Sequence, residues 1–323
     1  MNRFEFARAT SLAEALDLFA EKPGGLFKAG GIDLLDHLKE HLVEPPRLVD
    51  LKGIARLNAL AVEADGSLRI GPLMTLAQVA AHPAIRASHA ALAQACGEAA
   101  SPQIRNVATI GGNILQRPRC WYYRLEAYRC LKKGGDLCYA AGGENRYHAI
   151  FGDGPCHAPH PSNAAVALVA LGAALTFEGQ KGRRAVPAEQ FFTRPDADPR
   201  RENAREPGEI LTEISLPAAP GMRSSYASLQ ERAAFDWPLV SAAAALRAEG
   251  GIVREARVTL GAVATVPLRA PAAEQALLGR RLDEATIDAA AQAALAGAQP
   301  LSDNGYKIEL ARTLLRRTLA AMA

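Results

Sequence analysis

The sequence predicts a mixed α/β protein of two domains, and three observations support this class. Its 323 residues exceed the roughly 150 residues of a typical single domain. Segments with helical spacing alternate with short apolar segments, several of which end at glycine pairs. Apolar residues make up 49% of the chain and charged residues 22%, so the chain can bury a sizeable core.

Capping and glycine signals predict the elements of the first half. Ser11 to Glu14 has the spacing of a helix capping box, and apolar residues follow at helical intervals. A short strand at 26–29 runs into Gly30-Gly31. A second helix is expected from Asp33 to Leu42, because the prolines at 45 and 46 stop it. A hairpin and two further helices are expected at residues 57–62 with 68–73, at 76–81 and at 89–99.

Alternation of helix and strand returns after residue 158. A helix at 163–171 and a strand at 174–178 precede a charged, proline-interrupted surface loop at 195–207. The strand at 210–216 ends at Pro217 to Gly221, which we take as the boundary between domains of residues 1–218 and 219–323. Beyond it we expect an antiparallel pair of strands at residues 240–248 and 252–263. Three Ala/Leu-rich helices are expected at residues 272–278, 284–296 and 303–321.

Charge and hydropathy exclude several classes of protein. A net charge of +3, with Lys and Arg mostly dispersed, argues against nucleic-acid binding. No apolar run approaches the roughly 20 residues needed to cross a bilayer, so no membrane span is expected. Met1 to Arg8 lacks the apolar stretch of a secretory signal, and a disulfide framework is therefore the weaker interpretation of the cysteines.

Two glycine pairs have the surroundings of a cofactor-binding loop. Residues 28–35 place a strand, a glycine pair and a helix start in order, and residues 108–113 repeat a glycine pair beside a hydroxyl and an amide. Glycines let backbone N–H groups approach a ligand, and a helix N-terminus favours an anion such as pyrophosphate. The loops match neither the G-x-G-x-x-G fingerprint nor a P-loop. A tight turn without a ligand is the alternative for each.

Four of the five cysteines lie in an irregular segment of about residues 116–158, at Cys120, Cys130, Cys138 and Cys156. Their spacings lack the short knuckles of zinc fingers, whereas a 4Fe–4S cluster needs only four converging thiolates. Basic residues outnumber acidic ones there and would offset an anionic cluster. Zinc, a mixed site with His148, His157 or His160, and a basic surface loop whose thiols bind nothing remain alternatives. Cys96 is expected to pack in a helix.

Together these segments resemble the FAD-binding subunit of molybdenum hydroxylases, the xanthine dehydrogenase family. The resemblance rests on Lys28 to Leu35, where the family usually has Thr in place of Ile32, and on Ser101 to Asn113. It extends over essentially the whole chain. Asn113 to Cys120, followed by three more cysteines, resembles the branch of the bacterial aldehyde oxidoreductases and, more distantly, the 4-hydroxybenzoyl-CoA reductase β subunit, in which this subunit carries an extra 4Fe–4S cluster.

The resemblance implies a two-part α/β FAD-binding domain with a cluster-binding insertion, then a small domain of antiparallel sheet and helices. Related members have Asp at the position of Asn163 and a flavin-contacting Lys at that of Ser228, so the flavin environment departs from the family pattern. No catalytic residue is expected. The implied FAD-binding residues are Phe27, Lys28, Ala29, Gly30, Gly31, Ile32, Asp33, Leu34, Ala108, Thr109, Gly111, Gly112, Asn113, Asn163 and Leu211, and the implied cluster ligands are Cys120, Cys130, Cys138 and Cys156.

The resemblance also implies a function and partners. The chain would be the FAD- and 4Fe–4S-binding electron-transfer subunit of a bacterial, soluble, aldehyde-oxidising enzyme. A large partner with molybdenum cofactor would oxidise the substrate, and a small partner with 2Fe–2S clusters would relay electrons towards a terminal acceptor. The complex would be cytoplasmic, or periplasmic through a partner that carries the signal.

Two other functions stay open from the residues: a stand-alone flavin reductase, and a zinc-stabilised interaction module without a redox role. A further hypothesis concerns the charge of the insertion. Its basic side chains would favour an acidic redox partner, with solvated surface charge as the alternative.

Overall fold

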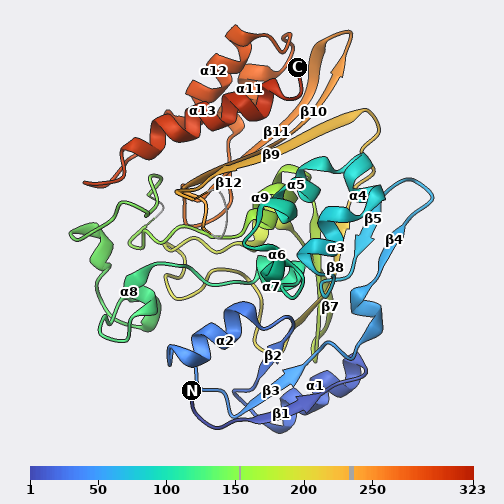
Figure 1. The fold of residues 1–323 in the computed structure, drawn as a ribbon, viewed down its shortest axis with the longest axis vertical. Coiled ribbons are helices and arrows are strands. Elements are labelled where there is room, and N and C mark those ends of the chain that lie inside the picture. Colours follow the sequence, from blue (N-terminus) through green and yellow to red (C-terminus); the bar gives the residue numbers. More distant parts are fainter. Residues whose placement is uncertain (153, 233–235) are drawn as a thin grey trace.

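The computed structural model describes residues 1–152, 154–232 and 236–323. The strands of these residues form three sheets, which follow one another from the bottom to the top of Figure 1. The segment that carries four cysteines lies at the left flank of this view, around the short helix α8 (Trp121–Arg124). The mixed α/β class predicted from the sequence is confirmed.

The first sheet is parallel and positions the first glycine pair. Its order is β1 (Glu5–Arg8), β3 (Arg47–Asp50), β2 (Leu26–Lys28), and the helices α1 (Leu12–Glu21) and α2 (Ile32–Lys39) connect the strands. Because β2 ends at Lys28 and α2 begins at Ile32, the glycine pair forms the strand-to-helix turn, as the sequence predicts.

Two helix ends in this region differ from the predicted pattern. Ser11 caps α1, since its hydroxyl accepts a hydrogen bond from the Glu14 amide at 3.1 Å. The Glu14 carboxylate, however, bonds to Thr10 instead of closing the box onto Ser11. Helix α2 ends at Lys39, before the predicted Leu42, because the chain passes through a left-handed His41 with φ of 55°.

The second sheet has five antiparallel strands. Their order is β4 (Leu60–Val62), β5 (Leu68–Ile70), β8 (Ile210–Leu216), β6 (Ala174–Gly179), β7 (Gly182–Pro187). The predicted hairpin and the predicted strands at 174–178 and 210–216 are confirmed. β7 was not predicted, because Val186 is its one large apolar residue and no alternating apolar pattern marks it.

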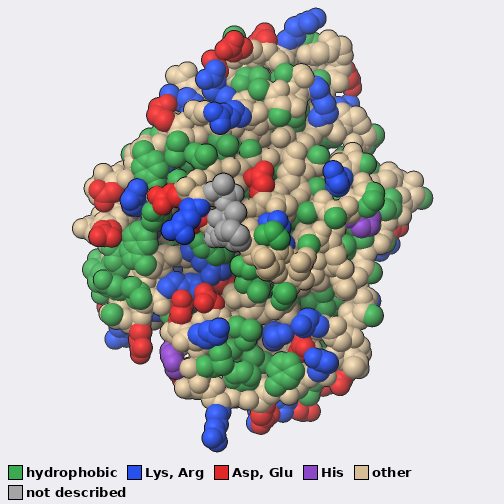
Figure 2. Space-filling view, in the orientation of Figure 1, with side chains coloured by type: hydrophobic (Ala, Val, Ile, Leu, Met, Phe, Trp, Pro, Cys, Tyr) green, Lys and Arg blue, Asp and Glu red, His purple; other side chains and the backbone are tan. Residues whose placement is uncertain are grey.

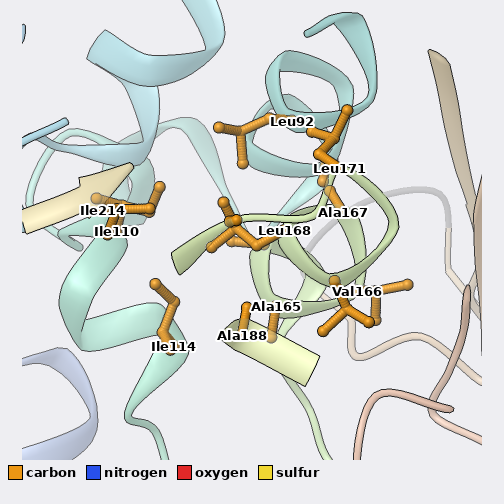
Figure 3. Close-up of a cluster of buried hydrophobic side chains, with 14 of the residues drawn as sticks. Leu92, Ile110, Ile114, Ala165, Val166, Ala167, Leu168, Leu171, Ala188 and Ile214 are labelled. Atoms are coloured by element: carbon orange, nitrogen blue, oxygen red, sulfur yellow. The ribbon is translucent and has the colours of Figure 1, made fainter. Parts of the chain in front are cut away.

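Helices beside the second sheet enclose the largest core. α3 (Leu76–Ala81), α5 (Ala90–Glu98) and α9 (Asn163–Ala170) occupy predicted positions. All residues of α9 are buried, and Figure 3 shows Leu168 of this helix between Leu92, Ile110 and Ile114. Cys96 is wholly buried in this core, as expected. Short elements here are η1 (Ala55–Asn58), α4 (Pro83–Ser88), α6 (Pro102–Arg105), α7 (Ile110–Ile114) and α10 (Ala188–Phe191).

The third sheet and three helices form the C-terminal part. The antiparallel order is β12 (Leu268–Arg269), β11 (Ile252–Gly261), β10 (Val240–Glu249), β9 (Met222–Leu229). A second buried core joins the sheet to the predicted helices (Figure 1), which are α11 (Pro271–Leu277), α12 (Glu284–Leu295) and α13 (Tyr306–Ala320). Among the described residues, no helix combines the length and the apolar character needed to cross a membrane.

The cysteine segment contains little regular structure, as predicted. Besides α8 it has only the single turns η2 (Leu131–Lys133) and η3 (Tyr139–Ala141) within the described residues up to 158. The predicted surface loop at 195–207 needs a correction. Glu202 within it is buried, since it makes ion pairs with Arg117 and Lys132 of the cysteine segment.

Candidate functional site

A cavity of about 810 Å³ opens where the first sheet, the helices α2 and α7 and the loop before β8 meet. Both glycine pairs lie in its wall. Glycines and apolar residues make up much of the wall, and Arg117, Arg119, Arg200, Arg201 and Arg205 also line it. Such a mixed cavity suits a ligand with an apolar ring and a charged group.

The first glycine pair brings backbone close to the cavity. A Cβ atom added to Gly30 would lie 2.3 Å from the carbonyl oxygen of Val107, so only glycine lets the two loops touch. Gly31 has φ of +85° and is the N-cap of α2, where L side chains are strained. The free N–H groups of the α2 N-terminus therefore lie at the cavity wall, where a phosphate would be favoured.

The second glycine pair lies in the first turn of α7. Thr109 caps this helix, because its hydroxyl accepts a hydrogen bond from the Gly112 amide at 3.1 Å. The Asn113 side-chain oxygen accepts from the Ser162 hydroxyl at 2.7 Å and from the Ala164 amide at 3.3 Å. These bonds tie α7 to the start of α9, and so place Asn163 at the same cavity.

The predicted FAD-binding residues fall almost entirely in this wall. Lys28 does not line the cavity, since its ammonium lies 3.4 Å from the Asp50 carboxylate. Ser228, the position aligned with a flavin-contacting Lys, is not in the wall either, and it bonds to Glu98. The predicted residues that line the cavity are Phe27, Ala29, Gly30, Gly31, Ile32, Asp33, Leu34, Ala108, Thr109, Gly111, Gly112, Asn113, Asn163 and Leu211.

Several wall residues were not anticipated from the sequence. Arg117 and Arg119 enter from the cysteine segment, and Trp237 enters from the C-terminal part. The Arg119 guanidinium lies 4.1 Å from the centre of the Trp237 ring, a cation–π contact across the wall. No local pattern marks these side chains, because long-range packing alone brings them to the cavity.

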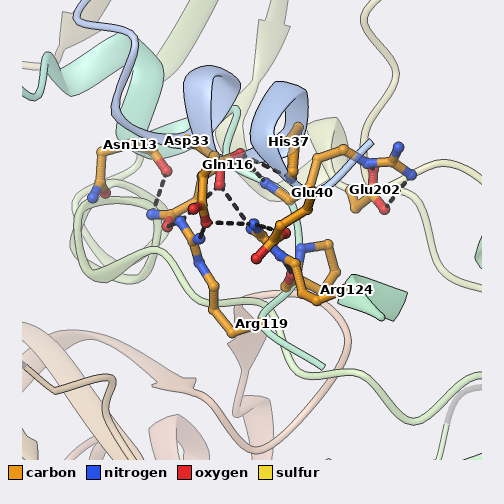
Figure 4. Close-up of polar contacts among 11 residues, drawn as sticks. Asp33, His37, Glu40, Asn113, Gln116, Arg119, Arg124 and Glu202 are labelled. Atoms are coloured by element: carbon orange, nitrogen blue, oxygen red, sulfur yellow. Dashed lines mark hydrogen bonds and ion pairs between the residues drawn. The ribbon is translucent and has the colours of Figure 1, made fainter. Parts of the chain in front are cut away.

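An ion-pair network joins the cysteine segment to α2 (Figure 4). Asp33 accepts a hydrogen bond from the Arg117 amide at 2.9 Å, and its other oxygen lies 2.7 Å from Arg119 and 2.9 Å from Arg124. Arg124 also reaches Glu40 at 3.1 Å. Figure 2 shows charged side chains of both signs gathered below the grey residues, where α2 faces the cysteine segment.

The network sets the protonation state of its members. Burial raises the pKa of Asp33, but Arg119, His37, the Arg117 amide and Arg124 outweigh it and leave the pKa below its ordinary value. Burial, in contrast, lowers the pKa of His37 to about 4. At neutral pH we therefore expect a charged Asp33 beside a neutral His37.

A second buried network anchors the loop before β8. Glu202 accepts hydrogen bonds from Arg117 at 3.0 Å and pairs with Lys132 at 3.1 Å. Burial raises the pKa of Glu202, but Arg117 and Lys132 outweigh it and lower the pKa overall. Arg117, Arg119, Arg124 and Lys132 are thus committed to internal ion pairs, which weakens the sequence-based case for a basic docking surface.

The four clustered cysteines are free thiols that interact with one another. Cys138 and Cys156 share a hydrogen bond, and Cys120 lies within electrostatic range of Cys138 and Cys130. Cys130 and Cys156 are buried, and Cys120 and Cys138 are half-buried. Residues that are up to 36 positions apart in sequence therefore lie close enough to interact.

Backbone amides point at three of these sulfurs. The Tyr122 amide faces the Cys120 sulfur, whereas the Tyr123 amide donates to the Cys120 carbonyl at 3.1 Å. The amides of His157 and Ala140 face the Cys138 sulfur, and that of Ala158 faces the Cys156 sulfur. The hydrogen bond with Cys156 lowers the pKa of Cys138 to about 5, whereas the same bond and burial raise the pKa of Cys156. Amide donors of this kind stabilise sulfur in its thiolate form.

Within residues 1–152, 154–232 and 236–323, no three His, Cys, Asp or Glu side chains already surround one point that could hold a single metal ion. A polynuclear cluster needs a different arrangement, because each thiolate binds a different iron. A free-thiol quartet with amide donors and aromatic neighbours fits such a cluster in donor chemistry.

Two known families match the chain. Residues 2–219 match the family described as the FAD binding domain in molybdopterin dehydrogenase, and residues 224–322 match the CO dehydrogenase flavoprotein C-terminal domain. The matches together cover nearly the whole chain.

Individual proteins resemble it along their full length. The aldehyde oxidoreductase FAD-binding subunit of Escherichia coli K12 is 36% identical, over 99% of this chain and 98% of that protein. Carbon monoxide dehydrogenase of Hydrogenophaga pseudoflava has a chain that superposes with a TM-score of 0.78, at 29% identity, over 99% of this chain and 97% of that one. Quinoline 2-oxidoreductase from Pseudomonas putida 86 superposes with a TM-score of 0.78 at 26% identity, over 99% and 96%.

Proposed function

Because the chain belongs to the FAD-binding subunits of the molybdenum hydroxylase family, we propose that it carries both FAD and a 4Fe–4S cluster in a molybdenum-dependent aldehyde oxidoreductase. Its part in that oxidoreductase would be electron transfer rather than attack on the organic substrate. The observation that carries the proposal is the single cavity lined by both glycine loops and flanked by the cysteine segment.

The cavity residues would hold FAD by backbone more than by side chain. The α2 N-terminus at Gly31 and the capped turn at Thr109 would face the pyrophosphate, and Asn113 and Asn163 the ribitol and ring side. Leu211, which also lines the cavity, would face the adenine through its backbone. When bound, FAD supplies both one-electron and two-electron chemistry, which suits a junction between iron–sulfur centres and a terminal acceptor.

Cys120, Cys130, Cys138 and Cys156 would hold the cluster. Their thiols are free and already within interaction range of one another, and amide N–H groups face three of the sulfurs. Binding would replace the Cys138–Cys156 hydrogen bond by bonds to iron, since metal ligands must lose their protons. A zinc ion held by the same thiols is the alternative, and a stand-alone flavin reductase is the alternative for the cavity.

Two partner chains complete the proposal. A large subunit with molybdenum cofactor would oxidise an aldehyde, and a small subunit with 2Fe–2S clusters would connect it to this chain. The aldehyde class is supported by the relative of 36% identity, whose name gives that activity. The complex would work in the cytoplasm, or in the periplasm if a partner carries the export signal.

The experiment is co-expression with the two partner chains, followed by assays of iron, sulfide, zinc and FAD in the purified complex. Cys130→Ser should remove about four iron and four sulfide per chain, and Cys96→Ser should leave them unchanged because Cys96 is buried in the distant core. Zinc in place of iron would support the interaction module. A chain that binds FAD and, without partners, catalyses its reduction by NADH or NADPH would support the flavin reductase.

A further inference from the structure

A histidine side chain points at one of the proposed cluster ligands. The Nε2 atom of His148 lies 3.2 Å from the Sγ atom of Cys120. His148 is almost completely buried, and its Nδ1 has no hydrogen-bond partner among the described residues. Among the described residues, the Cys120 sulfur is therefore the polar partner of this ring.

Neighbouring groups fix the ring in this position. Trp121 packs edge-on against it, with ring centres 4.9 Å apart, and Tyr122 lies at 6.0 Å. The His148 carbonyl accepts hydrogen bonds from Lys307 at 2.9 Å and from Asn304 at 3.2 Å. Lys307 is itself wholly buried in α13, so the C-terminal part of the chain holds the backbone of this histidine from behind.

Loading of a cluster decides the direction of the hydrogen bond. The free thiol of Cys120 could either donate to the imidazole or accept from it, and the tautomer is open. A cysteine bound to iron has lost its proton and can only accept. With iron present, the 3.2 Å contact is retained only if Nε2 carries the proton and donates it to the sulfur.

We propose that His148 is a positioning residue that donates a hydrogen bond to the Cys120 sulfur and thereby raises the reduction potential of the cluster. The inference rests on the proposed function, because it requires the cluster. A reduced cluster carries one more negative charge, and part of that charge resides on the ligand sulfurs. A donated N–H stabilises the reduced form more than the oxidised form, which is a known means of setting cluster potentials.

The test is a redox titration of the cluster in the purified complex, followed by electron paramagnetic resonance. His148→Phe removes the donor and should lower the ratio of reduced to oxidised cluster at a fixed potential about tenfold, which corresponds to about 59 mV for one electron. His148→Gln can still donate an N–H and should restore most of the potential. Tyr306→Phe removes the hydrogen bond to the Arg146 carbonyl in the same part of the segment without touching the donor, and should leave the potential near that of the wild type.

A measurement on the wild type avoids dependence on the variants. With histidine labelled with ¹⁵N in its ring only, pulsed paramagnetic resonance of the reduced cluster should show a weakly coupled nitrogen that is lost in His148→Phe. A strong coupling would make His148 a ligand and overturn the proposal, as would the absence of any coupling. Equal potentials in the wild type, His148→Phe and His148→Gln would overturn it while leaving the cluster assignment intact. A wild-type complex without iron would instead overturn the proposed function, and this inference with it.

Discussion

At the scale of single residues, Gly30 determines whether the two loops of the cavity can meet. Its missing side chain leaves room for the Val107 carbonyl, and a Cβ atom would have to lie 2.3 Å from that oxygen. The clash involves backbone on both sides, so no side-chain rotation can relieve it. The need for glycine here is therefore steric and independent of the ligand.

Gly30→Ala should force the loops apart and reduce both FAD content and stability. We expect a loss of about 1–3 kcal/mol in the free energy of unfolding and less bound FAD per chain after purification. Gly97→Ala is the control, because its Cβ would contact Ala80 at an ordinary 3.7 Å within α5. Equal FAD content in the two variants would show that the loops do not need this contact.

His160 gives a residue-scale prediction about pH. It is buried, and burial lowers its pKa to about 3, from an ordinary value of 6.5. Below pH 6.5 the unfolded chain binds a proton that the folded chain does not. The contribution of this residue to stability is thus complete above pH 6.5 and is lost as the pH falls towards 3.

The corresponding measurement is urea unfolding of the wild type and His160→Asn across this pH window. Between pH 6.5 and 4.5 the free energy of unfolding of the wild type should fall by about 2–3 kcal/mol more than that of the variant, which has no titrating group at position 160. Asn keeps an acceptor for the Ser162 amide, which bonds to Nδ1 at 3.4 Å in the wild type. If the free energies of unfolding of the wild type and His160→Asn changed equally with pH, His160 would take up its proton without unfolding of the chain.

At the scale of elements, α2 and the cysteine segment are held together by charge. Asp33 lies in the first turn of α2 and is the meeting point of the Arg117 amide and the Arg119 and Arg124 guanidinium groups. Its side chain is only 16% exposed, against 46% for Asp36 in the next turn. The same two arginines pair with both carboxylates, so the chain offers a matched comparison.

Asp33→Ala should destabilise the protein by roughly 1–3 kcal/mol, because it leaves the largely buried guanidinium groups of Arg119 and Arg124 without one of their partners. Asp36→Ala should cost less than about 1 kcal/mol, since exposed ion pairs contribute little. Chemical unfolding of both variants measures the difference. Asp33→Ala should also lose FAD and iron together if the network couples the two sites, and a loss of neither would contradict that coupling.

The sequence predicts those elements that carry their own signal. The strand Ile210–Leu216 and the helices near residues 76–81, 163–171 and 284–296 follow from periodicity and caps, and they are confirmed. β1 and β3 were missed, because pairing in a parallel sheet comes from residues some forty positions apart. α7 was read as a turn, since a glycine pair in its first turn hides a helix that Thr109 caps.

The residues of the candidate site likewise fall into those that a local sequence signal marks and those that it does not. The glycine loops and the cysteines could be named because composition and spacing mark them locally. Arg119, Trp237 and Glu202 could not, since each reaches its place through contacts between distant segments. Lys28, inside the first glycine motif, pairs with Asp50 and does not line the cavity, so its predicted role in FAD binding stays a prediction.

At the scale of the whole molecule, the cysteine segment bridges the N-terminal and C-terminal parts. Its Arg residues bind α2, and the start of α13 holds its other end through bonds from Lys307, Asn304 and Tyr306. Figure 1 shows this position between α2 below and α13 above. The segment is therefore built into the fold on both sides.

This arrangement changes the expected response to salt. Four of the basic side chains that suggested an acidic partner are engaged in internal ion pairs. We expect the rate of electron transfer from the complex to an acidic iron–sulfur acceptor to fall only weakly as salt concentration rises. Stopped-flow measurements at several salt concentrations test this. A steep fall would restore the hypothesis of a basic docking surface.

The central claim is that one chain brings a 4Fe–4S cluster and FAD together. Diffraction from crystals of the purified complex, recorded on both sides of the iron absorption edge, tests it most directly. The account predicts one strong iron peak enclosed by Cys120, Cys130, Cys138 and Cys156, and flavin density in the cavity beside Gly31 and Thr109. Zinc or no metal at the cysteines, or a cavity without flavin, would contradict it.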